Sequence, residues 1–210
     1  MQEKQQCPIP VTKRKLLMVE GKDEVNFFEE FFKHLEINDV VDIREVRGKD
    51  NFRNQIPALI SKVSGSAKLE KVAIIRDADE SSMSAFESIK GIFKANNFKG
   101  PEKPGEFSGD NPRIGVFIMP DNKNNGMLEN LCLESIKGDS GLECVDKFID
   151  CANQFENRLK EKDIAKAKVQ AFLSIVPEVP NSIGVGAKKG VWNFDSPQLQ
   201  PLIDFLSQLK

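Results

Sequence analysis

Two aspartates, Asp77 and Asp79, stand one residue apart where a buried apolar segment ends. The segment reads "KVAIIRDADESS", and the run from Val72 to Ile75 has the apolar character of a strand covered on both faces. Two like charges this close repel each other, which raises a carboxyl pKa or attracts a cation. Carboxylates with no histidine or cysteine beside them are ligands for Mg²⁺ or Mn²⁺ rather than zinc. The pair therefore indicates a divalent-metal site, although aspartates after a strand are also common turn and capping residues.

Other acidic residues follow apolar runs in the same way. Glu20 ends the run "RKLLMVEG", Asp121 follows the run "RIGVFIMP", and Glu129 stands at the start of the next helix. In a parallel α/β sheet, ligands bind beyond the carboxyl ends of the strands. If the strands that carry Glu20 and Asp77 are neighbours, their carboxylates converge at that edge. A metal ion held there would also position a phosphate group and activate a water molecule.

Strands and helices alternate along the first part of the chain. Short apolar runs predict four strands, at residues 14–21, 39–48, 72–76 and 113–120. Apolar residues at helical spacing predict helices between and after them, at residues 22–37, 50–65, 82–98 and 127–136, and Asp23 is positioned to cap the first. This order predicts an α/β fold with a mainly parallel, Rossmann-like four-stranded sheet and helices on both faces.

The rest of the chain is predicted to be a helical extension. Residues 99–112, rich in proline and glycine, predict a long loop. Further amphipathic stretches predict helices at 142–159 and 163–173, and a final helix follows Ser196 with Pro197 at its first position. We divide the chain into three parts that form one globular domain: an arm at 1–12, the α/β core at 13–135 and an extension packed on that core at 136–210.

Composition limits the function classes. The chain has 210 residues, of which 40% are apolar and 30% charged, with a formal net charge of −2. There is no global attraction to nucleic acid or to acidic membranes, so nucleic-acid binding requires a local basic patch or bridging metal ions. No apolar run approaches the roughly 20 residues of a membrane span, and the N-terminus lacks the apolar segment of a secretory signal. A cytoplasmic protein is predicted.

The cysteines do not predict a zinc site. The chain has four cysteines, no C-x-x-C pair and a single histidine, His34. Reduced thiols are expected, as in cytosolic proteins. Cys144 and Cys151 are seven residues apart and share a helix face, where we expect them to pack in the core.

Two segments resemble a known family. The apolar strands that end in "MVEGKDE" and "IRDAD" are similar to the Toprim domain of type IA and type II topoisomerases, bacterial primases and OLD-family nucleases. The signature of that domain is a Glu followed by Gly after the first strand and a D-x-D after a later one. These correspond to Glu20–Gly21 and to Asp77 and Asp79. The sequence more closely resembles a stand-alone, uncharacterised bacterial Toprim-like group related to OLD nucleases, which "GMLENL" and the tail "VGAKKGVWNFDSPQLQPLIDFL" also resemble.

The resemblance implies a Toprim-like fold and a role for each matching acid. Glu20 would bind metal or move a proton, and Asp77 and Asp79 would be metal ligands. Glu129 resembles the extra acid of OLD-type nucleases and would hold a second ion, with Mg²⁺ or Mn²⁺ as the cofactor. The chain has no tyrosine, so topoisomerase chemistry through a tyrosyl–DNA link cannot occur in this chain alone, and it has no P-loop.

Lysines supply candidate substrate contacts. Lys22 and Lys49 flank the same predicted edge and are positioned to bind phosphates. OLD nucleases use a downstream lysine to stabilise charge in the transition state, and that resemblance implies Lys166 or Lys168 here. Nothing in the sequence selects between the two lysines, and we take Lys168 as the working assignment.

Two functions fit these residues. The first is metal-dependent hydrolysis of a nucleic-acid phosphodiester bond, or phosphoryl transfer. The second is a non-catalytic module that binds metal and a nucleotide as an accessory subunit in DNA or RNA processing or in defence. The near-neutral charge favours this second function or a small, nucleotide-like substrate. A nucleic acid or nucleotide is the expected partner and a membrane is not, while a homo-oligomer or a partner protein stays open.

Overall fold

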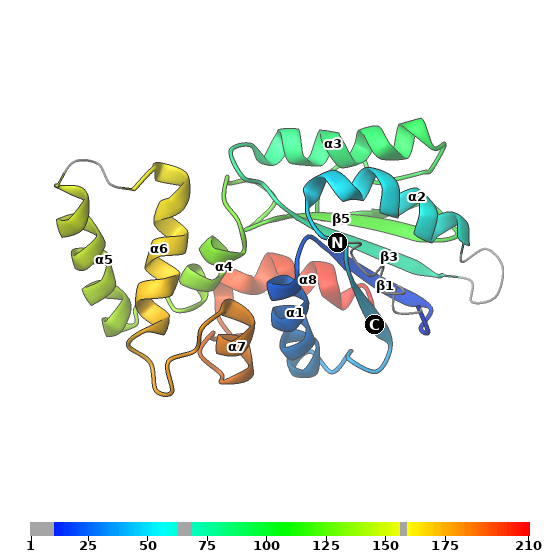
Figure 1. Cartoon of the computed structure of the whole chain (residues 1–210). Coiled ribbons are helices and arrows are strands. Elements are labelled where there is room, and N and C mark those ends of the chain that lie inside the picture. The colour runs from blue at the N-terminus through cyan, green and yellow to red at the C-terminus, as the bar shows by residue number, and fades with distance from the viewer. Residues whose placement is uncertain (1–10, 63–68, 156–158) are drawn as a thin grey trace, which may run out of the picture.

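The protein is built around one sheet with the strand order β2-β1-β3-β5-β4 (Figure 1). The structure is a computed structural model that describes residues 11–62, 69–155 and 159–210, so most of the predicted N-terminal arm lies outside the described residues. The strands are β1 Lys15–Val19, β2 Val41–Glu45, β3 Lys71–Asp77, β4 Phe107–Ser108 and β5 Arg113–Met119. The four predicted strands pair in parallel, and β4 pairs antiparallel with β5. The predicted α/β fold is confirmed, with β4 as an addition.

The edge strand β4 lies inside the segment that was predicted to be only a loop. Phe107 covers Gly115 of β5, where a Cβ atom would stand 2.5 Å from the Phe107 ring. The same ring stacks on Phe205, with centroids 5.0 Å apart. Two residues are too few to show the alternation by which a sequence reveals a strand. Tertiary contacts therefore determine β4.

Helices cover both faces of the sheet (Figure 1). On one face, α2 (Phe52–Lys62) and α3 (Ser82–Ala95) bury the even-numbered side chains of β1. On the other face, α1 (Lys22–His34) and α8 (Gln200–Ser207) bury its odd-numbered side chains. This two-sided burial explains why the central strands are continuously apolar in the sequence.

The remaining helices lie beyond the carboxyl edge of the sheet (Figure 1). They are α4 Leu128–Ser135, α5 Ser140–Asn153, α6 Glu161–Leu173 and α7 Ile183–Lys188, with short 3-10 turns at Lys49–Asn51 and Pro197–Leu199. One apolar cluster joins these helices to α1 and to one face of the sheet. Among the described residues, no helix is long and apolar enough to cross a membrane.

Asp23 serves a different helix from the one predicted. The N-cap of α1 is Gly21, and its backbone has no side-chain cap. The carboxylate of Asp23 instead accepts hydrogen bonds from the N–H groups of Ile183 and Gly184, at 3.2 and 2.9 Å. The helices touch closely here, because a Cβ atom on Gly184 would lie 2.3 Å from that of Asn26. Asp23 therefore joins α1 to α7, a long-range contact that no local pattern predicts.

The prediction that Cys144 and Cys151 pack in the core was wrong. Both lie on α5 and both are exposed. The buried side of this helix is formed by Val145 and Ile149. The helix thus carries two apolar stripes, and only one of them is packed against the rest of the described chain.

Candidate functional site

The acids at the ends of β1 and β3 converge at the carboxyl edge of the sheet. Because β1 and β3 are neighbouring parallel strands, Glu20 lies beside Asp77. Oε1 of Glu20 accepts a hydrogen bond from the backbone N–H of Asp77 at 3.3 Å. The Nε atom of Arg76 lies 3.7 Å from the same oxygen. Strand order alone therefore brings together two acids that are far apart in the sequence.

Asp77 lies at the centre of the acidic residues. Its Oδ1 accepts a hydrogen bond from the N–H of Leu128, the first residue of α4, at 3.1 Å. Burial raises the pKa of the Asp77 carboxyl well above its usual range. Four other carboxylates raise it further, those of Glu20, Glu24, Glu129 and Asp79. These four carboxylates therefore lie near enough to Asp77 to act on its charge.

Glu20 is also held in a poorly solvated position. Burial raises its pKa to about 7, against the opposing charge of Arg76. The two side chains are only 15% and 12% exposed. In the described part of the chain, Nε of Arg76 is a buried side-chain nitrogen with no hydrogen-bond partner. The guanidinium thus offsets negative charge as an ion pair, without the geometry of a hydrogen bond to Glu20.

Glu24 is an acid of this group that the sequence analysis missed. It lies in the first turn of α1 and folds back so that its Oε2 would be 2.9 Å from a Cβ atom on Gly21. Burial raises the pKa of Glu24, and the charge of Glu129 raises it further. The signal that could have revealed it is its spacing of four residues from Glu20. A glycine at position 21 leaves the room that Glu24 needs.

Three cations border the acids. Nζ of Lys49 lies 2.7 Å from Oδ2 of Asp79, in a half-exposed ion pair. Burial raises the pKa of Glu129, and the charge of Lys166 on α6 opposes that rise. With Arg76 as the third cation, three positive charges face these five carboxylates, and Asp23 adds a further negative charge beside Glu24 and Glu129, so negative charge is in excess when the acids are ionised.

The other predicted site residues lie elsewhere or act locally. Lys168 forms an ion pair with Asp146 of α5 at 2.7 Å, so the structure brings Lys166 rather than Lys168 to the acids. Lys22 is the exposed first residue of α1. Asp121 accepts hydrogen bonds from the backbone N–H groups two and three residues further on, which lower its pKa. Its carboxylate therefore forms a local turn.

The acids offer only oxygen ligands, which suit a hard divalent ion, but their side chains are not arranged around a metal position in this structure. Among the described residues, no three acidic, histidine or cysteine side chains stand in an arrangement that could hold a metal ion. The carboxylate of Asp79, a residue with a φ of +52°, forms an ion pair with Lys49. The donor set consists of oxygens only, and a divalent cation would relieve the repulsion that raises the pKa values of these acids. The residues therefore fit Mg²⁺ or Mn²⁺ in their chemistry, and Lys49 competes with such an ion for the charge of Asp79.

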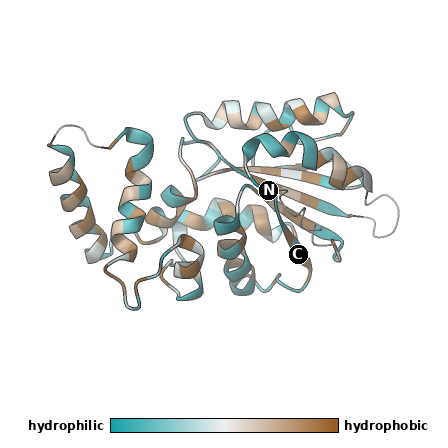
Figure 2. Ribbon diagram, in the orientation of Figure 1, coloured by the Kyte–Doolittle hydropathy of each residue, from teal (hydrophilic) through white to brown (hydrophobic). Residues whose placement is uncertain are grey.

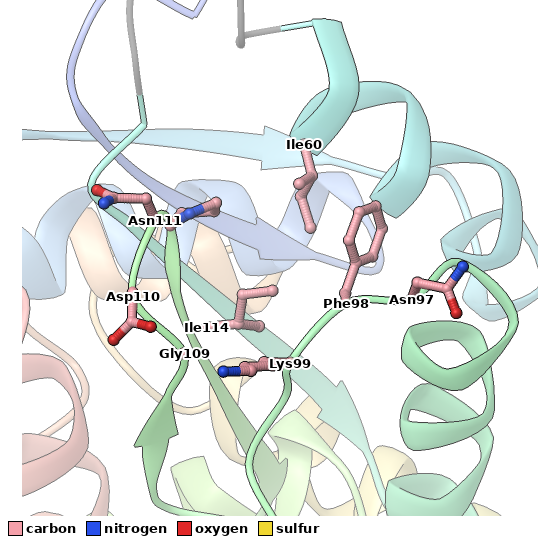
Figure 3. Close-up of a pocket in the computed structure, with 9 residues that line it drawn as sticks. Ile60, Asn97, Phe98, Lys99, Gly109, Asp110, Asn111 and Ile114 are labelled. Atoms are coloured by element: carbon pink, nitrogen blue, oxygen red, sulfur yellow. The ribbon is translucent and has the colours of Figure 1, made fainter.

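A cavity of about 600 Å³ lies at the opposite edge of the sheet (Figure 3). Its apolar lining includes Ile60, Phe98 and Ile114. Ile114 pairs with Val72 near the amino ends of β5 and β3, whereas the acids follow their carboxyl ends. Strands of seven residues span about 20 Å. A small ligand in this cavity would not reach the acids.

The fold and site define an α/β protein with an acidic cluster at the carboxyl edge of a mainly parallel sheet. The chain belongs to the family described as "Protein of unknown function (DUF3226)", whose profile matches residues 14–210. No curated protein matches the chain.

Solved structures similar to this chain include the C-terminal region of the Xanthomonas campestris pv. campestris OLD protein. In the form phased with iodine, the identity is 14% and the TM-score 0.45, over 94% of this chain and 96% of that chain. In the form phased with mercury, the identity is 13% and the TM-score 0.44, over 94% and 97% of the two chains.

Proposed function

We propose that this protein is a divalent-metal-dependent nuclease whose site is formed by Glu20, Asp77, Asp79 and Glu129. The observation that carries the proposal is the surroundings of Asp77, a buried carboxylate with four further carboxylates around it at the carboxyl edge of the sheet. Such a group disfavours folding unless a cation compensates it, and strongly perturbed acids gather at functional sites. The resemblance of "MVEGKDE" and "IRDAD" to the Toprim signature supports the same function.

Each acid has a role in this proposal. Asp77 and Asp79 would hold the ion, and Glu129 would hold a second one. A bound Mg²⁺ or Mn²⁺ would polarise the phosphoryl oxygens and acidify the attacking water. Glu20, whose carboxylate lies beside Asp77, is positioned to accept the proton that this water loses as it attacks phosphorus. The bond between phosphorus and the leaving oxygen breaks, and the leaving oxygen takes a proton from solvent.

Lys49 connects metal binding to substrate binding. Its ammonium group pairs with Oδ2 of Asp79, so Lys49 competes with a metal ion for the negative charge of this carboxylate. The freed ammonium group would stay at the same edge of the sheet, where it would contact a phosphate oxygen. Lys22, at the first residue of α1, is the second candidate for such a contact.

We expect Lys49→Met to strengthen Mn²⁺ binding and to weaken nucleic-acid binding. An exposed ion pair contributes about 1 kcal/mol at most, so the gain in Mn²⁺ affinity should be no more than about fivefold. Calorimetric titration measures the metal affinity, and fluorescence anisotropy with labelled DNA measures substrate binding. Lys90→Met removes an ion pair with Glu102 outside the acidic group and is the matched control. Unchanged or weaker Mn²⁺ binding by Lys49→Met would rule out the competition.

Nuclease activity is the direct test of the proposed function. Single- and double-stranded DNA and RNA are incubated with Mg²⁺ or Mn²⁺ and with wild type, Asp77→Asn or Asp121→Asn. We expect cleavage by the wild type and by Asp121→Asn, whose carboxylate forms only a local turn. Loss of a metal ligand should slow cleavage on the order of 10³-fold, or about 4 kcal/mol. Equal cleavage by the wild type and Asp77→Asn would refute the proposal.

Two observations favour the alternative of a non-catalytic metal- and nucleotide-binding module. Lys49 already neutralises Asp79, and no three ligands within the described ranges are arranged around a metal position. For this alternative, Mn²⁺ and a nucleotide would bind in calorimetry while no nucleic acid is cleaved. The nuclease assay and the calorimetric titration together therefore separate the two functions.

A further inference from the structure

The outer face of α5 carries an apolar stripe that no described segment of the chain covers. It consists of Cys144, Phe148, Cys151 and Phe155, at spacings of four, three and four residues. Phe148 is 62% and Phe155 61% exposed, and both cysteines are exposed. Phe155 lies just past the helix end, where its N–H donates to the carbonyl of Ala152 at 3.3 Å and continues the turn. This spacing places the four side chains along one face.

The opposite side of α5 is already packed. Val145 and Ile149 are buried in the apolar cluster that includes α6, and Asp146 pairs with Lys168 of α6. Figure 1 shows α5 as the outermost helix of the extension, and Figure 2 shows brown, apolar positions along it. Ile175, itself 56% exposed, lengthens the stripe, because a Cβ atom on Gly141 would lie 3.0 Å from its Cδ1. A helix that is apolar on two faces is normally covered on both.

We propose that this stripe is a homodimer interface, in which α5 packs antiparallel against α5 of a second copy of the chain. Spacings of four and three residues are those of the a and d positions of a coiled-coil seam. The stripe alternates small and large side chains. A twofold axis between Phe148 and Cys151 places Phe148 opposite Cys151 of the second copy, and Cys144 opposite Phe155. Every layer then contains one large and one small side chain, which is how facing helices interdigitate. A symmetric pairing of this kind is closed and stops at two copies.

The exposed area limits the size of the dimer interface. A phenylalanine buries about 200 Å² when it is covered, so the Phe148 and Phe155 side chains of two copies, each about 60% exposed, supply roughly 500 Å². Stable interfaces bury about 1,200–2,000 Å² in total. The cysteines and Ile175 bring the seam toward the lower end of that range. We therefore expect a reversible dimer with a dissociation constant on the order of 10 µM.

Sedimentation equilibrium over a range of concentrations tests the interface. We expect the wild type to shift from its monomer mass of 23.5 kDa to twice that value as the concentration rises. Phe148→Glu should stay monomeric up to about 200 µM, with an unchanged circular dichroism spectrum because the side chain is exposed. Met83→Glu changes another exposed apolar residue, 78% exposed on α3, and should dimerise like the wild type. A wild type that stays monomeric, or a Phe148→Glu variant that dimerises as well as the wild type, would overturn the proposal.

Disulfide cross-linking tests the orientation. The background variant carries Cys7→Ser and Cys151→Ser, which leaves Cys144 as the exposed thiol among the described residues. Diamide, which accepts the two electrons and two protons released by a pair of thiols, is added at a concentration of protein that gives dimers. We expect a covalent dimer only after Phe155→Cys is added, through Cys144 of the other copy. Cross-linking of the background itself would show a parallel pairing, and no cross-link in either variant would also contradict the proposed register.

Discussion

Asp77→Asn is expected to stabilise the metal-free protein while it removes metal-dependent function. The asparagine Oδ1 still accepts the hydrogen bond from the N–H of Leu128. The substitution removes a carboxylate whose pKa is raised by burial and by four neighbouring carboxylates. We expect the free energy of unfolding at pH 8, in the presence of a chelator, to rise by about 2 kcal/mol. Urea denaturation followed by circular dichroism measures this change.

The matched control for that substitution is Asp121→Asn. It removes the same charge from a carboxylate whose pKa is lowered by hydrogen bonds, so it should not stabilise the protein. Mn²⁺ should stabilise the wild type and Asp121→Asn, because a ligand that binds only the folded state stabilises it. It should have no such effect on Asp77→Asn. A variant that is less stable than the wild type in chelator would show that the acids are not mutually repelling.

The second large effect is a loss of stability as the pH rises in the absence of metal. The pKa of Glu20 rises from 4.5 to about 7 on folding. Between these values the folded state binds more protons than the unfolded state, so the free energy of unfolding falls as the pH increases. The stabilisation is present below pH 4.5 and is lost as the pH passes through about 7. A change of this size corresponds to about 3 kcal/mol.

Glu20→Gln should flatten this dependence. The test compares the free energy of unfolding at pH 5 with that at pH 8. The substitution also leaves Arg76 without its counter-ion, but a loss of protein stability that is equal at both pH values cancels in this difference. Glu102→Gln is the control, since Lys90 lowers the pKa of that exposed carboxyl and its small effect has the opposite sign. Equal slopes in the wild type and Glu20→Gln would contradict the raised pKa of Glu20.

Much of the fold was predictable from local patterns. The apolar run before Asp77 identifies a strand buried on both faces, and the run before Glu20 identifies its neighbour. Parallel strands end at one edge of a sheet, so the sequence predicts that Glu20 and Asp77 converge if their strands are neighbours, and β1 and β3 are neighbours. Each apolar run and the acid that follows it are adjacent in the chain, so the sequence alone reveals both strands and both acids.

The features that the sequence did not reveal depend on contacts between distant segments. Glu24 joins the acids because α1 begins against them, and Lys166 rather than Lys168 faces them because of how α6 is rotated. Spacing alone could not distinguish two lysines that are two residues apart. Likewise, the α5 stripe has the same periodicity as a buried stripe, so only the position of α6 shows which of the two is exposed.

Calorimetric titration of Mn²⁺ decides whether the acids around Asp77 form a divalent-metal site. Wild type, Asp77→Asn and Asp121→Asn are titrated at pH 8, where the Glu20 carboxyl is largely ionised. We expect saturable Mn²⁺ binding by the wild type and by Asp121→Asn, and none by Asp77→Asn. Equal Mn²⁺ binding by the wild type and Asp77→Asn, or no binding by the wild type, would contradict this prediction.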